Sequence, residues 1–229
     1  MRGSYGQFCP VSMASEILCA RWSPLLIREF LCGSTRFNDL RRGLPRMSPS
    51  LLSKRLAELE AVGVIQSFKG DQCVKEYRLT KAGEELRPLI MAIGTWGQRW
   101  VESGISLNNL DPELLIWDMH RFLVIDPLPE RRVCLQFVFN NLPTARQNYW
   151  LLADPQSGVE ACYADPGYDI DLYAVSSLRT MTAIWMGLDT VKKAVSDGRL
   201  ELTGAREVAN RMQEWLGLSP FAHEERMAG

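Results

Sequence analysis

Residues 36–63 read RFNDLRRGLPRMSPSLLSKRLAELEAVG, and this stretch decides the fold of the first half of the chain. Ser48 belongs to the residue types that cap helix N-termini, and Pro49 suits the first helical position, where its missing N–H costs nothing. The stretch therefore predicts a helix over Ser48–Val62. A shorter predicted helix, Phe37–Arg42, precedes it, and two such helices joined by a short turn form a helix-turn-helix.

The predicted helix over Ser48–Val62 has an apolar and a polar face. Three leucines recur at helical spacing and form a stripe that should be buried: Leu52, Leu56 and Leu59. Gly63 then suits the helix end. The polar residues outside the stripe, which should mostly face solvent or a ligand, are Ser50, Ser53, Lys54, Arg55 and Glu58. We interpret this helix as the recognition helix of the pair.

Positive charge gathers on the same stretch. From Arg36 to Arg55, six basic residues stand against one acid, Asp39, and they are Arg36, Arg41, Arg42, Arg46, Lys54 and Arg55. Such a cluster suits phosphate contact, because DNA carries one negative charge per about 1.7 Å of its axis. A solvated basic face on an ordinary helical hairpin accounts for the charge equally well, so charge alone does not establish DNA binding.

A predicted β-hairpin follows the recognition helix at once. Val64–Phe68 and Val74–Leu79 are strand-like runs, and Gly70-Asp71 between them is a turn signal. A helix-turn-helix followed by a hairpin is a winged helix. Lys69 and Lys75 lie at or near the hairpin tip, where a wing contacts the DNA backbone or minor groove.

Several short pieces of the chain carry a resemblance to a known family. They are Phe8-Cys9-Pro10-Val11, Leu26-Ile27-Arg28-Glu29, Arg36-Phe37-Asn38-Asp39-Leu40, Met47-Ser48-Pro49, Leu51-Leu52-Ser53 and Glu76-Tyr77-Arg78-Leu79-Thr80. Together they resemble the HxlR-type regulators, a branch of winged-helix repressors near the MarR type, over about residues 4–103. The hairpin tip departs from the family pattern, since it is short and lacks the prolines common there.

A long helix is predicted after the hairpin, from Lys81 to about Ser103. Its apolar stripe is wider than one face of a small domain needs, which predicts a dimer interface. The stripe residues are Leu86, Leu89, Ile90, Ile93, Trp96 and Trp100. The resemblance implies the same, since such regulators are homodimers whose two recognition helices reach successive major grooves of a palindromic double-stranded DNA site. Packing of the stripe against the C-terminal domain is the alternative.

Charge differs between the two halves of the chain. Residues 1–105 hold 15 Lys and Arg against 10 Asp and Glu, a net charge of +5, whereas residues 106–229 hold 11 against 17, a net charge of −6. This division fits a DNA-binding module followed by a module with another role. We find no apolar run long enough to span a membrane and no signal-peptide pattern, so we expect no membrane partner and a cytoplasmic protein.

Metal and cofactor chemistry are not expected. The chain has six cysteines, which lack metal-ligand spacing, and two histidines. Phosphate-loop, zinc-protease and nucleophile-elbow motifs are missing, so we expect no enzymatic activity. Cys9 precedes Pro10 and a predicted helix, and an accessible thiol near a helix N-terminus can be reactive. Some HxlR-type regulators sense oxidants through a cysteine here, so the resemblance implies a redox switch; structural burial is the alternative.

The second half is predicted to be a separate α/β domain over residues 106–229, divided at Gly104–Asp111 from a first domain over residues 1–105. The expected helices are Pro112–Leu123, Ser176–Met186, Asp189–Ser196 and Ala205–Leu216. The expected strands are Arg132–Phe139, Gln147–Leu152, Gly158–Tyr163, Tyr168–Val175 and Arg199–Leu202. We therefore predict an α+β chain in which the first four of these strands form an antiparallel meander packed against helices.

This order of elements resembles a sterol carrier protein-like domain. The resemblance rests on Asp169-Ile170-Asp171-Leu172-Tyr173, the helix Leu178–Trp185, Gly187 and the run from Asp197 to Gly204. It implies an apolar tunnel for a hydrophobic molecule. The candidate lining residues are Phe137, Phe139, Trp150, Leu152, Tyr173, Met181, Ile184 and Trp185. Ordinary core packing is the alternative for each.

The sequence thus predicts a homodimeric transcriptional regulator, with a hydrophobic effector or thiol modification as its control. The residues expected to contact DNA are Arg36, Arg41, Arg42, Arg46, Ser48, Ser50, Ser53, Lys54, Arg55, Lys69 and Lys75. Those expected at or near base edges are Ser50, Ser53, Lys54 and Arg55. The rival reading is a hydrophobic-ligand protein whose winged helix serves only protein interaction.

Overall fold

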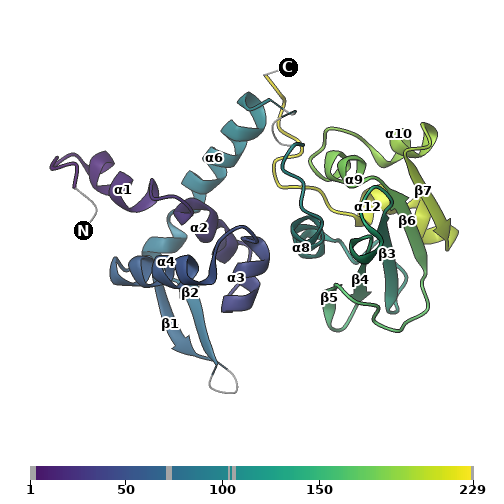
Figure 1. Cartoon of the computed structure of the whole chain (residues 1–229), viewed down its shortest axis with the longest axis horizontal. Helices are drawn as coiled ribbons and strands as arrows, with labels where there is room; N and C mark the ends of the chain where they lie inside the picture. Colours follow the sequence, from purple (N-terminus) through teal and green to yellow (C-terminus); the bar gives the residue numbers. More distant parts are fainter. Residues whose placement is uncertain (1–3, 71–73, 103, 105–106, 228–229) are drawn as a thin grey trace. The chain divides into compact units, whose positions relative to one another are not determined.

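A computed structural model of the chain describes residues 4–70, 74–102, 104 and 107–227 (Figure 1). The chain divides into two compact units, residues 1–94 and 95–229. The division falls upstream of Gly104–Asp111, where the sequence predicts the boundary, and lies inside the helix α6 (Arg87–Trp100). No helix among the described residues is long and apolar enough to cross a membrane.

The first unit is a winged helix. Its elements are α1 (Pro10–Leu18), α2 (Ser23–Leu31), α3 (Phe37–Gly43), α4 (Pro49–Ala61), β1 (Ile65–Lys69), β2 (Lys75–Leu79), α5 (Lys81–Glu84) and the first part of α6. The two strands pair antiparallel and extend from the helices as a hairpin (Figure 1). Part of the predicted turn, from Asp71 onward, lies outside the described residues.

The signals at both ends of α4 confirm the helix predicted over Ser48–Val62. The Ser48 hydroxyl accepts a hydrogen bond from the Leu51 N–H at 3.3 Å, and Pro49 is the first helical residue. Gly63 has φ +74°, the left-handed conformation that glycine tolerates best. The predicted leucine stripe, Leu52, Leu56 and Leu59, is fully buried in the core of this unit.

The predicted continuous helix over residues 81–103 is wrong at one point. The structure ends α5 at Glu84 and begins α6 at Arg87. Pro88 explains the break, because proline lacks an N–H and its ring clashes with the carbonyl four residues earlier in a continuing helix. Thr80 caps α5 as its sequence suggests, accepting a hydrogen bond from the Gly83 N–H at 3.3 Å.

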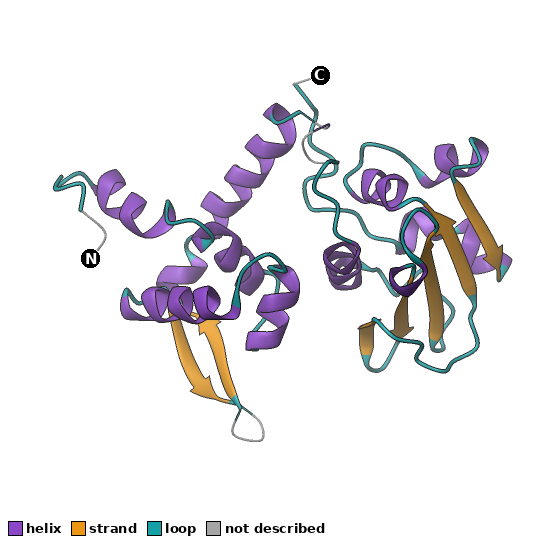
Figure 2. Ribbon diagram, in the orientation of Figure 1, coloured by secondary structure: helices purple, strands orange, loops and turns teal. Residues whose placement is uncertain are grey.

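The second unit contains a five-stranded mixed sheet with the order β5-β4-β3-β6-β7 (Figure 2). The strands are β3 (Val133–Phe139), β4 (Asn148–Asp154), β5 (Gly158–Cys162), β6 (Leu172–Ser176) and β7 (Leu200–Gly204). The helices are α8 (Pro112–Phe122), the short 3-10 helix η2 (Thr144–Arg146), α9 (Leu178–Trp185), α10 (Val191–Ser196), α11 (Arg206–Asn210) and α12 (Met212–Trp215). The predicted α+β composition is confirmed, but the last predicted helix, Ala205–Leu216, is divided into α11 and α12.

The predicted meander is wrong for β6. β3, β4 and β5 are antiparallel neighbours, but β6 pairs with β3 in parallel, on the side away from β4. The chain between Cys162 and Leu172 therefore returns past the sheet instead of forming a hairpin. A parallel neighbour requires such a crossover, which local sequence patterns do not reveal.

Residues of the second unit hold the end of α6. Glu224 accepts hydrogen bonds from Arg99 (Nη2–Oε2 2.6 Å) and Thr95 (Oγ1–Oε1 3.1 Å). Gln98 donates from Nε2 to the Met186 carbonyl at 3.1 Å, and Arg226 donates from Nη2 to the Val101 carbonyl at 2.6 Å. The C-terminal part of α6 is thus bound to the C-terminal segment, residues 219–227, and to the end of α9.

Candidate nucleic-acid interface

The outward face of α4 is polar and accessible. Ser50, Ser53 and Lys54 are exposed, as the sequence predicts, and Ala57 continues the same face. Ser48 is also exposed, and its hydroxyl lies 3.2 Å from that of Ser50. Small hydroxyl side chains and one lysine leave the helix backbone close to the surface. This face can therefore enter a groove and offer hydrogen-bond donors to base edges.

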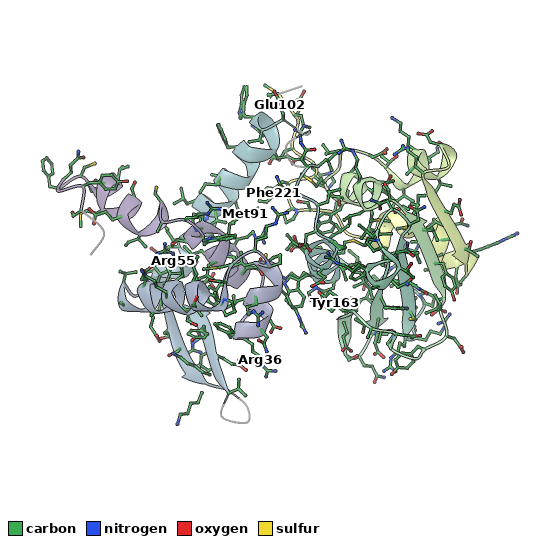
Figure 3. All side chains as sticks on the ribbon, in the orientation of Figure 1. Arg36, Arg55, Met91, Glu102, Tyr163 and Phe221 are labelled. Carbon is green, nitrogen blue, oxygen red and sulfur yellow. The ribbon has the colours of Figure 1, made fainter. Side chains whose placement is uncertain are left out.

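Arg55 does not belong to this face, and the expectation that it would be accessible is wrong. It is only 3% exposed. Its Nε donates to the Arg21 carbonyl at 3.1 Å, and its Nη1 pairs with the carboxylate of Glu58 (Figure 3). The spacing of Leu52, Arg55 and Leu59 puts Arg55 on the buried stripe, and this spacing is the signal that the sequence analysis missed.

Three predicted phosphate contacts, Arg41, Arg42 and Arg46, are exposed on α3 and the turn after it. Arg42 lies 3.4 Å from Asp39 through Nη1 and Oδ1, one helical turn away. An exposed pair of this kind is weak and can be exchanged for a phosphate. These arginines precede the outward face of α4 and give it a positively charged flank.

Arg36 has an additional structural partner. Its Nε donates to Oε1 of Glu76 on β2 at 2.9 Å, while Thr35 donates to the other oxygen of the same carboxylate at 3.3 Å. Arg36 therefore joins the start of α3 to the wing (Figure 3). Part of its charge is neutralised, so we expect a smaller contribution to phosphate binding than from the arginines of α3.

The wing carries three exposed cations. Lys69 and Lys75 lie directly opposite each other on β1 and β2. The Lys75 ammonium lies 3.8 Å from the Glu60 carboxylate and 4.9 Å from the Tyr77 ring. The third cation, Arg78, stacks over Phe68 at 5.0 Å, and the sequence analysis did not select it. The alternation of Arg78 with Tyr77 along β2 could have indicated its exposure.

Glu60 links the recognition helix to the wing. Hydrogen bonds from Ser67 lower the pKa of Glu60, with a smaller contribution from Lys75, and the Ser67 N–H donates to it at 2.9 Å. The carboxylate is therefore charged at neutral pH and fixes the start of the wing against α4.

The predicted dimer stripe separates into two sets. Ile90 is buried in the core of the first unit and Leu86 packs against that core, so neither is available to a partner. Four residues of the stripe remain exposed on α6: Leu89, Ile93, Trp96 and Trp100. Trp96 is 62% exposed, which is unusual for a tryptophan. Their spacing of three and four residues keeps them on one side of α6.

An apolar groove borders this exposed set in the first unit. Its volume is about 550 Å³, and its walls come from α1, the α1–α2 turn and α6. The lining residues are Val11, Ala14, Ser15, Leu18, Cys19, Ala20, Arg21, Pro24, Leu89 and Ile93. Val11 and Met13 of α1 are themselves exposed. Together with Leu89 and Ile93 of α6, which line it, the groove forms one candidate docking surface within residues 1–94.

The eight candidate tunnel residues do not converge. Phe137, Phe139, Met181, Ile184 and Trp185 belong to the core between the sheet and the helices. Trp150 and Leu152 lie in a separate cluster with Cys134, and Tyr173 is exposed. The register explains the separation: Phe137 is paired with Tyr149, so Trp150, the next residue on β4, points to the opposite face. The prediction that all eight residues line a single pocket is therefore wrong.

The cysteines occupy different environments. Cys9 is exposed directly before α1, so the alternative of structural burial is wrong, and Cys19 at the other end of α1 is exposed too. Cys134 is buried, and burial raises its pKa to about 11, with a further contribution from the charge of Asp171. Among the described residues, no group of three or more His, Cys, Asp or Glu side chains could hold a metal ion.

Comparisons with known proteins agree with this geometry. The family described as HxlR-like helix-turn-helix matches residues 17–104. The HTH-type transcriptional regulator YvaP of Bacillus subtilis (strain 168) is 36% identical over 99 residues, which make up 42% of this chain and 92% of YvaP. The HTH-type transcriptional regulator sll1512 of Synechocystis sp. is 33% identical over 99 residues, covering 42% of this chain and 73% of that protein.

Two solved structures are also similar to this part of the chain. The redox regulator HypR in its oxidized form is 32% identical and covers 39% of this chain and 95% of its own, with a TM-score of 0.37. The diamide-treated form of YodB from B. subtilis is 26% identical and covers 40% of this chain and 93% of its own, with a TM-score of 0.34.

The fold and the polar face of α4 define a winged helix-turn-helix transcriptional regulator. Within this class, the chain belongs to the HxlR-like helix-turn-helix family.

Proposed function

We propose that the protein is a sequence-specific repressor that binds a palindromic double-stranded DNA operator as a homodimer. The observation that carries this proposal is the outward face of α4, where Ser50, Ser53 and Lys54 are accessible beside exposed arginines of α3. The hydroxyl and ammonium groups would contact base edges or nearby phosphates. Arg41, Arg42, Arg46 and the wing cations would hold the backbone and fix the register.

The homodimer is proposed from the docking surface of α1 and α6. Exposed apolar residues on both helices border the groove, and an apolar surface of this kind marks an interaction site. A second copy is the proposed occupant, because the groove is apolar and the same surface carries exposed apolar side chains, such as Met13, that a partner's groove would accept. Two recognition helices would then face successive major grooves.

Control of DNA binding is proposed to act through Cys9 or through the C-terminal unit. Cys9 is exposed directly before α1, a helix of the proposed interface, so a modified thiol there would disturb the pairing of the copies. The redox regulator HypR supports this idea by analogy. A hydrophobic effector in the sterol carrier protein-like domain would instead need a pocket smaller than the eight-residue tunnel, within the core that contains Phe137 and Met181.

The test is a fluorescence-anisotropy titration of the whole protein against two duplexes over a range of salt concentrations. One duplex comes from the region upstream of its own gene, and the other has random sequence. We expect much tighter binding to the upstream duplex and a strong salt dependence. Weak and equal binding to both duplexes would contradict the proposal and favour a hydrophobic-ligand protein whose winged helix binds other proteins.

A matched pair of lysine variants sharpens the test. Lys54→Ala removes a cation from the outward face of α4, whereas Lys192→Ala removes an exposed cation from α10. If Lys54 contacts a phosphate, its loss reduces the slope of log affinity against log salt by about 0.9. Lys192→Ala should leave both affinity and slope unchanged. Equal slopes for the two variants would place α4 away from the DNA.

A further inference from the structure

The buried Arg55 connects the recognition helix to the turn between α1 and α2. Arginine is almost never fully buried unless it is paired, because removing its charge from water is costly. Here the guanidinium has two different partners. Nε donates to the Arg21 carbonyl at 3.1 Å, outside α4, and Nη1 pairs with Glu58 within α4. One side chain thus holds both the helix and the turn.

The turn that receives this hydrogen bond has a strained backbone. Trp22 follows Arg21 with φ +80°, and among the described residues it is the one non-glycine residue with positive φ. Such a conformation is unfavourable for a bulky residue and persists only where its surroundings fix it. The guanidinium of Arg21 also stacks over the Trp22 ring at 5.5 Å. The hydrogen bond from Arg55 to the preceding carbonyl is one of the contacts that can fix this turn.

Arg55 reaches across a gap between α1 and the recognition helix. A cavity of about 200 Å³ separates these helices, and its lining residues are Glu16, Ile17, Ala20, Ser23, Arg55, Glu58, Leu59 and Val62. Close packing is therefore incomplete at this point. On its other side, the same turn lines the apolar groove through Ala20 and Arg21.

We propose that Arg55 is a positioning residue for operator recognition. It holds α4 at a fixed angle to the α1–α2 turn, and the polar face of α4 reads the DNA while Arg55 stays with Arg21. This inference rests on the proposed DNA-binding function.

The geometry predicts that lysine cannot replace Arg55. A guanidinium reaches two acceptors in different directions with separate nitrogens, whereas an ammonium is a single point at the end of a flexible stem. Arg55→Lys keeps the positive charge but loses one of the two partners. Arg206→Lys is the matched control, because it makes the same exchange at an exposed position on α11, outside the proposed DNA interface.

The first measurement compares affinities for the preferred and the random duplex, well below the unfolding temperature of every variant. For Arg55→Lys we expect an unchanged salt slope and unchanged affinity for random duplex. The preference for the specific duplex should fall by about tenfold, comparable to one mismatched base pair. Arg206→Lys should retain the full preference. Unaltered preference in Arg55→Lys would overturn the inference, whereas a wild-type protein without any preference would instead refute the proposed function.

The second measurement is the rate at which the Arg55 Nε–H proton exchanges with solvent, followed by NMR. Its signal is assigned as the one that is missing from the spectrum of Arg55→Lys. Buried and hydrogen-bonded to a carbonyl, it should exchange slowly with solvent in the free protein. The inference requires that this protection persists when the specific duplex is bound. Loss of protection with DNA would mean that Arg55 leaves Arg21 to contact the duplex, and the positioning role would be wrong. If Arg55 were needed only for folding, Arg55→Lys would weaken binding to the specific and the random duplex alike. The first measurement would then show no selective loss of sequence preference.

Discussion

Arg99 and Glu224 form an ion pair in which Nη2 and Oε2 are 2.6 Å apart, although 125 residues separate them in sequence. The pair joins the end of α6 to the C-terminal segment, and Thr95 donates to the other oxygen of the same carboxylate. Long-range contacts of this kind make the end of α6 part of the second unit.

This pair predicts a pH-dependent contribution to stability. The hydrogen bond from Arg99, and then that from Thr95, lower the pKa of Glu224 below its ordinary value of 4.5. A lowered folded-state pKa stabilises the fold above the unfolded-state pKa, and this stabilisation is lost as pH falls through the folded-state pKa. Glu224→Gln should therefore lower the thermal unfolding temperature at pH 7, and the difference from wild type should shrink below about pH 4.5.

The neighbouring exposed Glu225 gives the control for that experiment. Glu225→Gln should change the unfolding temperature little at either pH, because no described hydrogen bond holds its carboxylate. A Glu224→Gln protein as stable as wild type at pH 7 would show that the ion pair contributes nothing measurable, as is common for exposed pairs.

A charge in the proposed interface should separate the two copies. Ile93 is 51% exposed on α6, so the Ile93→Glu variant should still fold. It places a carboxylate in the apolar contact between the two copies. We expect sedimentation velocity to show that Ile93→Glu is a monomer. Its affinity for a palindromic duplex should be lower than that of the wild-type protein. Val195→Glu alters an exposed valine on α10 and should leave the assembly unchanged. A stable Ile93→Glu dimer would exclude this side of α6 from the interface.

Shortening a core leucine of α4 should destabilise the winged helix. Leu52 is 0% exposed, and removal of its side chain beyond Cβ leaves a cavity in the core. Leu52→Ala should lower the free energy of unfolding in urea by about 2–5 kcal/mol. Leu25→Ala, at an exposed leucine of α2, should change it by no more than about 0.5 kcal/mol. Similar losses for both variants would contradict the packing of α4.

Thiol reactivity should distinguish the cysteines. Iodoacetamide reacts with thiolates, so at pH 8 the exposed Cys9 should be alkylated in the folded protein. Cys134 has a pKa of about 11 and is buried, so only about one molecule in a thousand would carry its thiolate at that pH. Peptide mass spectrometry before and after unfolding in urea measures the difference. Rapid alkylation of Cys134 in the folded protein would show that its strand opens readily.

A regulatory role for Cys9 makes a separate prediction. Release of DNA on treatment with diamide should disappear in Cys9→Ser, because the exposed thiol before α1 is then missing. Cys162→Ser, which changes a free thiol on β5 of the second unit, should keep the response and serves as the control. An unchanged response in Cys9→Ser would remove this thiol from the proposed control.

Local signals predicted the winged helix well. Ser48, Pro49 and Gly63 each act through their own backbone or a neighbour within one turn, so the sequence alone places the recognition helix. Arg55 was misjudged because its burial depends on a carbonyl of the α1–α2 turn, which lies 34 residues earlier. A polar side chain on an apolar stripe can be recognised by its spacing, but its partner cannot.

In the second unit, local sequence patterns predict the order of the elements but not the pairing of the strands. The order of its elements follows from local patterns, yet the parallel pairing of β6 with β3 depends on which strand edge is free after the others have paired. Phe137 and Trp150 likewise lie on opposite faces of the sheet, because the register between β3 and β4 decides the face of each side chain. The candidate tunnel failed because it combined residues from both faces.

The boundary between the two units lies inside α6, and this affects where the two domains could be joined to other proteins. A domain attached through a loop can be exchanged between genes at almost any position in that loop. Here Thr95, Gln98 and Arg99 on the helix must be inherited together with Met186 and Glu224, which hold them. A chimera joined after Ser103 would pair foreign partners with this helix. A chimera that keeps each set of contacts whole would therefore be joined within α6, near Gly94.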